Sequence, residues 1–458
     1  MITIVKKLHQ EIAKPALNGK QFVESLQNYF EQLYLLNAEN SKLFELSKSE
    51  LNEILQLSFE SRVNLNDRLN NFVEAPKKED GPFIEHVYDM NRALRYLEDY
   101  VLEVYMSDQS IADKEYHTLQ GKGLYFMVPP NQNFHGPDDL QSGDVILSRG
   151  SAFTSAAIAR IGVNDSQFSH LTFVYRNPEE NGKLYTIEAH IEIGSVVAPF
   201  QVHIDQKNSR TVVYRYEDAE LAHKAATYMY HKVKTQSDTG KNIEYNFSMQ
   251  LNDASKLFCS QVIYDGFQQA SNKTIDIPKF KTQFNSGLIT FLNRMGIPAS
   301  LENISHMETF SPGDIEYDPR FSLIAEWKDP NQLRDSRLKD AVLTKMFSWM
   351  ENDRYHIQAP VSVKAMSRFT WLIRRIPLVQ KLVEKKLPLN MNVEQLKIFL
   401  TLDKIGGVLK NAIIKLRETK KHPLTIKEMF DFLEEFRVQD GQSKKHLFHQ
   451  WFHERENA

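Results

Sequence analysis

The sequence predicts an α+β fold, in which a central region of mixed strands and helices lies between an N-terminal and a C-terminal helical region. Stretches rich in β-branched and aromatic residues concentrate in the central region, whereas apolar residues at helical spacing dominate on both sides of it. A chain of 458 residues also exceeds the usual size of one compact domain. We therefore expect three domains, at 1–128, 138–332 and 335–458.

The N-terminal region is expected to form a helical bundle. Between Val87 and Val104, apolar residues recur in alternating steps of three and four, which makes a stripe that packs against another helix. The stripe spans few heptads, and this favours packing inside the chain over a coiled coil with a partner. Pro76, Gly81 and Pro82 mark a loop between two helices.

The central region follows a turn-rich linker at 129–137 and alternates strands with helices. Strands are expected at 144–147, 171–175, 184–197 and 211–214, and helices at 153–161, at 219–233 and from Cys259 onward. Asp253 and Ser255 are the candidate capping residues of the Cys259 helix.

The C-terminal region returns to helix and is locally basic. Its positive residues include Arg374, Arg375, Lys381, Lys385, Lys386, Lys420 and Lys421. Solvated helix faces are the first interpretation of these charges. The second is contact with an anionic surface such as lipid headgroups, and hence peripheral membrane binding. The sequence points to no particular protein partner.

Composition limits the class of protein further. The net charge is −3 and charges of both signs are interspersed, so nothing favours nucleic-acid binding. A single cysteine excludes an intramolecular disulfide framework and a thiolate zinc cluster. The apolar run 1–5 precedes Lys6 and Lys7, the reverse of the order in a signal peptide, and no run approaches the roughly 20 apolar residues of a membrane span. We expect a cytoplasmic protein; export without a signal peptide, including delivery to a host cell, is the alternative.

The only cysteine, Cys259, is the first candidate for chemistry. Apolar residues at helical spacing follow it, so Cys259 is expected to open a buried helix, whose N–H groups and dipole favour an anion. A helix start next to an imidazole lowers the pKa of a thiol, and the thiolate is the nucleophile. The alternative is a structural role, because free cysteines are often buried only to fill space.

Strand phase indicates which polar side chains lie together. In the strand at 171–175, Leu171 and Phe173 share one face, and His170 points to the other. In the strand at 184–197, the polar face consists of Thr186, Glu188, His190 and Glu192. Burying such a row is costly unless its members are paired or functional, and an edge strand with one solvated face is the alternative.

Four segments in a fixed order carry a resemblance to a known family. They are Gly143–Gly150, which begins Gly-Asp-Val-Ile, Phe168–Val174 with Ser-His-Leu-Thr, Ile187–Ala189, and Phe258–Ile263 with Cys-Ser-Gln. This order resembles the YiiX/YaeF-type permuted NlpC/P60 cysteine hydrolases over about residues 140–330. The resemblance implies a circularly permuted papain-like core between the two helical domains. The family has Glu where this chain has Gln261, and we expect a change in local pairing there rather than a loss of activity.

The resemblance also implies a catalytic triad. Cys259 would be the nucleophile, His170 the base that forms an ion pair with it, and Glu188 the group that orients the imidazole. The candidates for substrate or oxyanion contacts are Tyr245, His190, Arg149 and Ser260, together with the backbone N–H of Cys259. His190 is also a rival for the orienting role, and a structural salt bridge is the alternative for Arg149. The implied chemistry needs no metal or organic cofactor.

The implied function is hydrolysis of an amide or peptide bond, or acyl transfer, through a thioester on Cys259. Two alternatives stay open. One is acyl hydrolysis or transfer on lipids, as in the lecithin:retinol acyltransferase-like proteins, so the expected substrate is a peptide, another amide or an acyl lipid. The other is a catalytically inactive helical interaction protein, which would be supported by ordinary thiol reactivity at Cys259.

Overall fold

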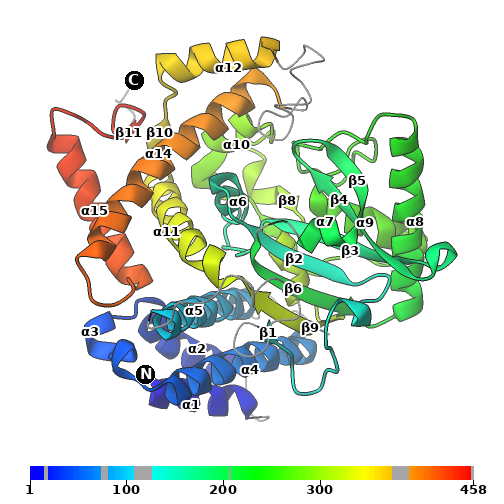
Figure 1. Cartoon of the computed structure of the whole chain (residues 1–458), viewed down its shortest axis with the longest axis horizontal. Coiled ribbons are helices and arrows are strands. Elements are labelled where there is room, and N and C mark those ends of the chain that lie inside the picture. Colours follow the sequence, from blue (N-terminus) through cyan, green and yellow to red (C-terminus); the bar gives the residue numbers. More distant parts are fainter. Residues whose placement is uncertain are drawn as a thin grey trace.

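The computed structural model describes residues 1–14, 19–73, 81–107, 126–204, 206, 208–373 and 391–454. A central antiparallel sheet lies between a helical bundle and a second helical region (Figure 1). This confirms the predicted α+β fold with helical regions on both sides of the core, whereas the three domain boundaries stay predictions. Residues 76–80 of the predicted loop, and the basic residues from Arg374 to Lys386, lie outside the described residues.

The N-terminal bundle consists of long helices that share one apolar core. Its helices are α1 (Ile2–Ala13), α2 (Gly19–Tyr34), α3 (Ala38–Ser41), the 3-10 helix η1 (Leu43–Glu45), α4 (Lys48–Val73) and α5 (Gly81–Met106). Val87, Leu94 and Val101 of α5 are fully buried in this core. The predicted stripe therefore packs against other helices of this chain.

The central sheet has seven strands in the order β1-β9-β6-β2-β3-β4-β5, and neighbouring strands are antiparallel. The strands are β1 (Phe126–Met127), β2 (Val145–Gly150), β3 (His170–Asn177), β4 (Lys183–His190), β5 (Gly194–Pro199), β6 (Asn208–Tyr216) and β9 (Phe321–Lys328). The single strand predicted at 184–197 is a hairpin of β4 and β5. Gly194 makes the reversal possible, because it has a φ of 75° and a Cβ there would meet the Ile243 carbonyl oxygen at 2.2 Å.

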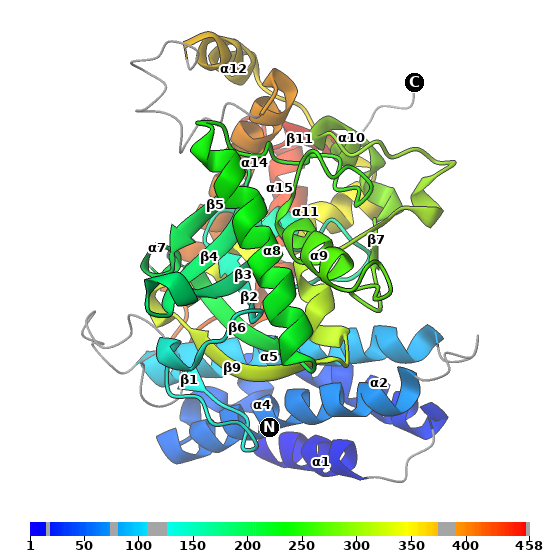
Figure 2. The ribbon, with the colours of Figure 1, turned by 90° about the vertical axis from the view of Figure 1, so that its right-hand side faces the viewer.

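Two helices, α8 (Ala219–Asp238) and α9 (Cys259–Ala270), cover one face of the sheet (Figure 2). Leu171, Phe173 and Ala189 point into the core beneath them, as the strand phase predicts. The predicted capping of α9 is wrong: its N-cap is Phe258, which has no polar side chain. The Asp253 carboxylate instead accepts hydrogen bonds from Ser255 in the preceding loop, too far upstream to reach the first turn of the helix.

The remaining elements complete the core and the C-terminal region. They are α6 (Phe153–Ile158), α7 (Phe200–Ile204), α10 (Ile289–Met295), α11 (Pro330–Asn352), α12 (Val361–Ile373), α14 (Val393–Glu418), α15 (Ile426–Gln442), the strands β7 (Thr282–Gln283), β8 (Glu308–Thr309), β10 (Tyr355–Ile357) and β11 (Phe452–Glu454), and the 3-10 helices η2 (Pro137–Asp139), η3 (Pro178–Glu180), η4 (Ser286–Leu288), η5 (Ile304–His306) and η6 (Pro312–Tyr317). The C-terminal region is helical as expected, except that β10 and β11 pair with each other. Phe153 and Phe291 from the central region enter the apolar core of its helices.

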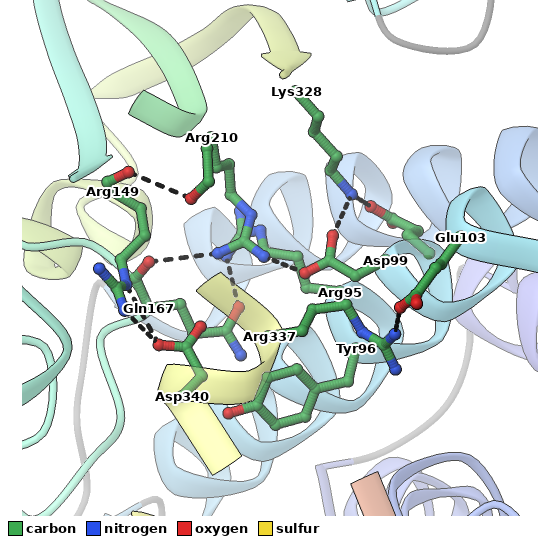
Figure 3. A network of polar contacts seen from close by, with 12 residues as sticks. Arg95, Tyr96, Asp99, Glu103, Arg149, Gln167, Arg210, Lys328, Arg337 and Asp340 are labelled. Carbon is green, nitrogen blue, oxygen red and sulfur yellow. Dashed lines mark hydrogen bonds and ion pairs between the residues drawn. The ribbon is translucent and has the colours of Figure 1, made fainter. Parts of the chain in front are cut away.

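Buried ion pairs join the bundle, the sheet and α11 (Figure 3). Asp99 of α5 binds Arg210 of β6, and Lys328 of β9 at 3.0 Å. In the neighbouring strand β2, the Arg149 guanidinium lies 2.6 Å from Asp340 of α11. Removing one partner of such a pair leaves a buried charge without compensation, at a cost of about 3–5 kcal/mol. The three regions are thus tied together by interactions that cannot be lost singly without a large penalty.

Candidate active site

The candidate site lies where the first turn of α9 meets β3 and β4. Cys259 is the first residue of α9, and only 5% of it is exposed. Gln261 is completely buried and fixes the loop that leads into the helix. Its Nε2 donates to the Asp253 carbonyl oxygen at 2.8 Å, and its Oε1 accepts from Asn246 Nδ2 at 3.1 Å. Gln261, the residue that departs from the family pattern, therefore holds the segment that precedes the cysteine against the first turn of the helix.

His170, the first residue of β3, is hydrogen-bonded to Cys259. Burial alone would lower the pKa of the imidazole and raise the pKa of the thiol. The hydrogen bond and the opposite charges of the two groups, together with Glu188 in the case of His170, outweigh burial: the pKa of His170 rises to about 10 and the pKa of Cys259 falls below its ordinary value. The Leu171 backbone N–H and the Ser260 hydroxyl, whose oxygen is 3.9 Å from Sγ, also stabilise the thiolate. The arrangement therefore favours a thiolate–imidazolium pair.

Glu188 of β4 is the partner of three histidines. Its Oε2 lies 2.9 Å from Nε2 of His170 and 3.2 Å from Nε2 of His190, and its Oε1 lies 3.4 Å from Nδ1 of His203. Burial by itself would raise the pKa of Glu188, but the charge of His203 and the hydrogen bonds from the three rings hold this pKa well below its ordinary value. The carboxylate is thus ionised. Because it occupies Nε2 of His170, Nδ1 is the ring nitrogen left for Cys259.

Two histidines complete the surroundings of the carboxylate. The His190 ring stacks on the His170 ring, with centroids 5.0 Å apart and an interplanar angle of 21°. His203, on α7, is buried, and its Nδ1 is also 3.4 Å from Thr172 Oγ1. Within the described part of the chain, Nε2 of His203 has no hydrogen-bond partner. Sequence reasoning missed His203, since one of 15 histidines on a short helix without strand phase gives no signal.

The same side chains include a group with metal-ligand geometry. Among the described residues, His170, Glu188 and His190 offer ligand atoms that lie within 4.8 Å of one another. Imidazole and carboxylate ligands suit zinc and related divalent ions. A metal ion there would need neutral imidazoles, so His170 would no longer serve as the charged partner of Cys259.

The accessory residues lie in different surroundings. Tyr245 is buried, and burial together with the charges of Cys259 and Glu192 raises its pKa well above the ordinary value, so the phenol stays a hydrogen-bond donor near the thiolate. Arg149 is completely buried and paired with Asp340, which favours the structural alternative for this residue. Glu192 lies in the turn after β4 and not on the polar strand face, because the strand ends at His190.

The central part of this chain is similar to known proteins. Among solved structures, the crystal structure of the metalloprotein yiiX from Escherichia coli O157:H7 (DUF1105) is similar at 20% sequence identity, covering 41% of this chain and 97% of that chain with a TM-score of 0.31. The comparison with curated proteins found no match. Residues 139–324 match the family described as "permuted papain-like amidase enzyme, YaeF/YiiX, C92 family". The family match therefore confirms, for the central part of this chain, the resemblance to YaeF/YiiX-type permuted papain-like amidases that its motifs predict.

Proposed function

We propose that the protein is a cysteine hydrolase whose triad is Cys259, His170 and Glu188, and that it cleaves an amide or peptide bond through a thioester intermediate. The observation that carries this proposal is the chain of contacts from the thiol to the imidazole and on to a buried carboxylate 2.9 Å from Nε2 of His170. The match of residues 139–324 to an amidase family supports the same class of reaction.

In the first step, the Cys259 thiolate attacks the carbonyl carbon of the scissile bond. The electron pair of the C=O bond moves to oxygen and forms a tetrahedral oxyanion. As this intermediate collapses, the His170 imidazolium gives its proton to the leaving nitrogen and the C–N bond breaks. The products of this half-reaction are a free amine and a thioester on Cys259.

In the second step, neutral His170 takes a proton from water while the water oxygen attacks the thioester carbonyl. Collapse of the second intermediate releases the carboxylic acid and restores the thiolate–imidazolium pair. Glu188 keeps its charge throughout and stabilises the imidazolium each time it forms.

The oxyanion has two candidate donors. The first N–H groups of an α-helix lack intrahelical partners, and the N-cap of α9 supplies no side-chain hydrogen bond, so the Cys259 N–H is available. Tyr245 is the second candidate, because its raised pKa keeps its hydroxyl protonated beside the reacting sulfur.

An acylating probe tests the mechanism, because the chain has a single thiol. With p-nitrophenyl acetate at neutral pH, we expect a burst of nitrophenolate and an acetyl group on Cys259, detected by mass spectrometry, which water then removes. Cys259→Ala should give no burst, and His170→Ala should acylate and deacylate slowly. Absence of an adduct on the native wild type, or an equally fast one on His170→Ala, would contradict the proposal and favour the inactive interaction protein.

The bond class needs a separate measurement. We expect a pool of short peptides to yield new amino groups in a reaction that requires Cys259. Fatty acid released from phospholipid vesicles, again only with Cys259 intact, would assign the protein to lipid acyl chemistry instead.

A further inference from the structure

Helix α12 (Val361–Ile373) carries an exposed apolar face. The exposed fractions are 79% for Val361, 47% for Met366, 64% for Phe369 and 63% for Leu372. The opposite side of the helix is anchored to the protein, since Val363 is 4% exposed and Ser367 is buried. Large apolar side chains that gather on one face in this way mark an interaction site more often than scattered ones do.

The position and geometry of α12 make this face accessible. With about 3.6 residues per turn, Val361 and Leu372 lie on the same side about three turns apart, and Phe369 lies beside Leu372. The helix is at the periphery of the molecule in two perpendicular views (Figures 1 and 2). A flat surface could therefore approach it without meeting the sheet or the bundle.

The charged residues beside the apolar face of α12 indicate which kind of surface this face binds. Lys364 and Arg368 are exposed, lie one turn apart beside the apolar face, and belong to a helix without acidic residues. The excess of basic residues continues after the helix. In residues 361–386 the only acidic residue is Glu384, and the basic residues are Lys364, Arg368, Arg374, Arg375, Lys381, Lys385 and Lys386. This local excess of positive charge stands out in a chain whose net charge is −3.

We propose that α12 binds the surface of a bilayer that contains anionic phospholipids, and that the helix then lies in the plane of the headgroups. Phe369, Leu372 and Met366 would insert among the upper acyl chains. Lys364 and Arg368 would extend from the edge of the helix to the phosphates, with their methylene stems over the apolar zone. None of the helices in the described ranges has the length and apolar character of a membrane span. The proposal concerns binding and does not rest on the catalytic one.

Vesicle flotation with the full-length protein tests the proposal. We expect phosphatidylcholine vesicles with phosphatidylserine to bind the wild type at low salt, and vesicles of phosphatidylcholine alone to bind it far less. Each basic side chain near an anionic surface contributes about fivefold, so the double variant of Lys364→Ala and Arg368→Ala should bind roughly 30-fold more weakly. Phe369→Glu should lower binding at least tenfold, through the loss of one inserted aromatic ring. Added salt should weaken wild-type binding.

Val438→Glu is the matched control. Val438 lies on α15, is 49% exposed, and its replacement introduces the same charge at a similar exposed apolar position. We expect this variant to bind vesicles like the wild type, and all variants to keep the wild-type thermal unfolding temperature because the altered side chains are exposed. Three results would overturn the proposal: no preference of the wild type for the anionic vesicles, full binding by Phe369→Glu, or self-association that Phe369→Glu abolishes without any vesicle binding. The last would assign the face to a second copy of the chain.

Discussion

Replacing Glu188 with Gln removes one charge from the site and keeps the shape of the side chain. The amide oxygen can still accept a hydrogen bond from Nε2 of His170, now 2.9 Å from the carboxylate. The rise of the His170 pKa from 6.5 to about 10 corresponds to about 5 kcal/mol in favour of the charged ring, to which the hydrogen bonds and charges of both Cys259 and Glu188 contribute. A hydrogen bond to a charged group contributes about 1.5–3 kcal/mol, so a loss of about 2 kcal/mol in the variant would make the imidazolium roughly 30-fold less favoured.

This loss should appear at the thiol. When the His170 imidazolium is less populated, it stabilises the Cys259 thiolate less, so the pKa of Cys259 should rise in Glu188→Gln. We expect alkylation by iodoacetamide to be roughly 30-fold slower than in the wild type on the acidic side of the profile, and similar where the thiol is ionised in both proteins. With one cysteine in the chain, the loss of free thiol has a single source.

The matched control is Glu192→Gln on the turn that follows β4, since Glu192 is among the main causes of the pKa shift of Tyr245 but not of that of Cys259. Its alkylation profile should overlay that of the wild type. Identical profiles for Glu188→Gln and the wild type would show that the buried carboxylate does not tune the pair, and the triad would reduce to a Cys–His dyad.

Other predictions concern the neighbours of this pair and the buried ion network. In the wild type, kcat/KM should fall as the pH passes about 10, because His170 then loses the proton that the leaving group needs; a rate that stays constant beyond that pH would assign the acid to another group. His203→Ala should raise the pKa of Glu188 and shift the acidic loss of activity to higher pH, while an unchanged acidic limb would make His203 a packing residue only. Asp340→Ala should lower the free energy of unfolding in urea by about 3–5 kcal/mol, because Arg149 loses its buried ion-pair partner and Arg160 keeps only Asp165, whereas Asp431→Ala, which breaks the exposed pair with Lys427, should cost less than about 1 kcal/mol. Equal effects of the two aspartate variants would argue against the network as a stabilising element.

The elements that the sequence predicts best are those whose own periodicity decides them. The stripe from Val87 to Val104 lies in α5, and the alternation around Leu171 lies in β3, because each needs only a neighbour of matching apolar character. β9 escaped prediction because Glu326 and Lys328 break its apolar pattern. Both charges are buried there, since helices of the N-terminal bundle supply Arg62 and Glu98 as partners. A strand whose polar residues are satisfied by another region cannot be identified from its own sequence.

In the candidate site, too, local sequence patterns predict some features and contacts between distant segments decide the others. Strand phase places His170 and Glu188 on a polar face, but their roles as base and orienting group come from the order of four motifs that resembles a family. His203 reaches Glu188 only because the chain turns from β5 into α7 at the edge of the sheet. That contact depends on tertiary structure, and no local sequence pattern around His203 predicts it.

The ion pairs between the sheet and α11 also constrain how this architecture can change in evolution. An apolar contact tolerates gradual replacement, since a smaller side chain leaves only a cavity. Asp340, by contrast, serves Arg149 and Arg160 together, so a neutral residue in its place would leave Arg149 without an ion-pair partner and Arg160 with Asp165 alone. Substitutions here should therefore be coordinated: a homologue that keeps α11 should retain the acid with both arginines, and a homologue without α11 should carry an uncharged residue in place of Arg149.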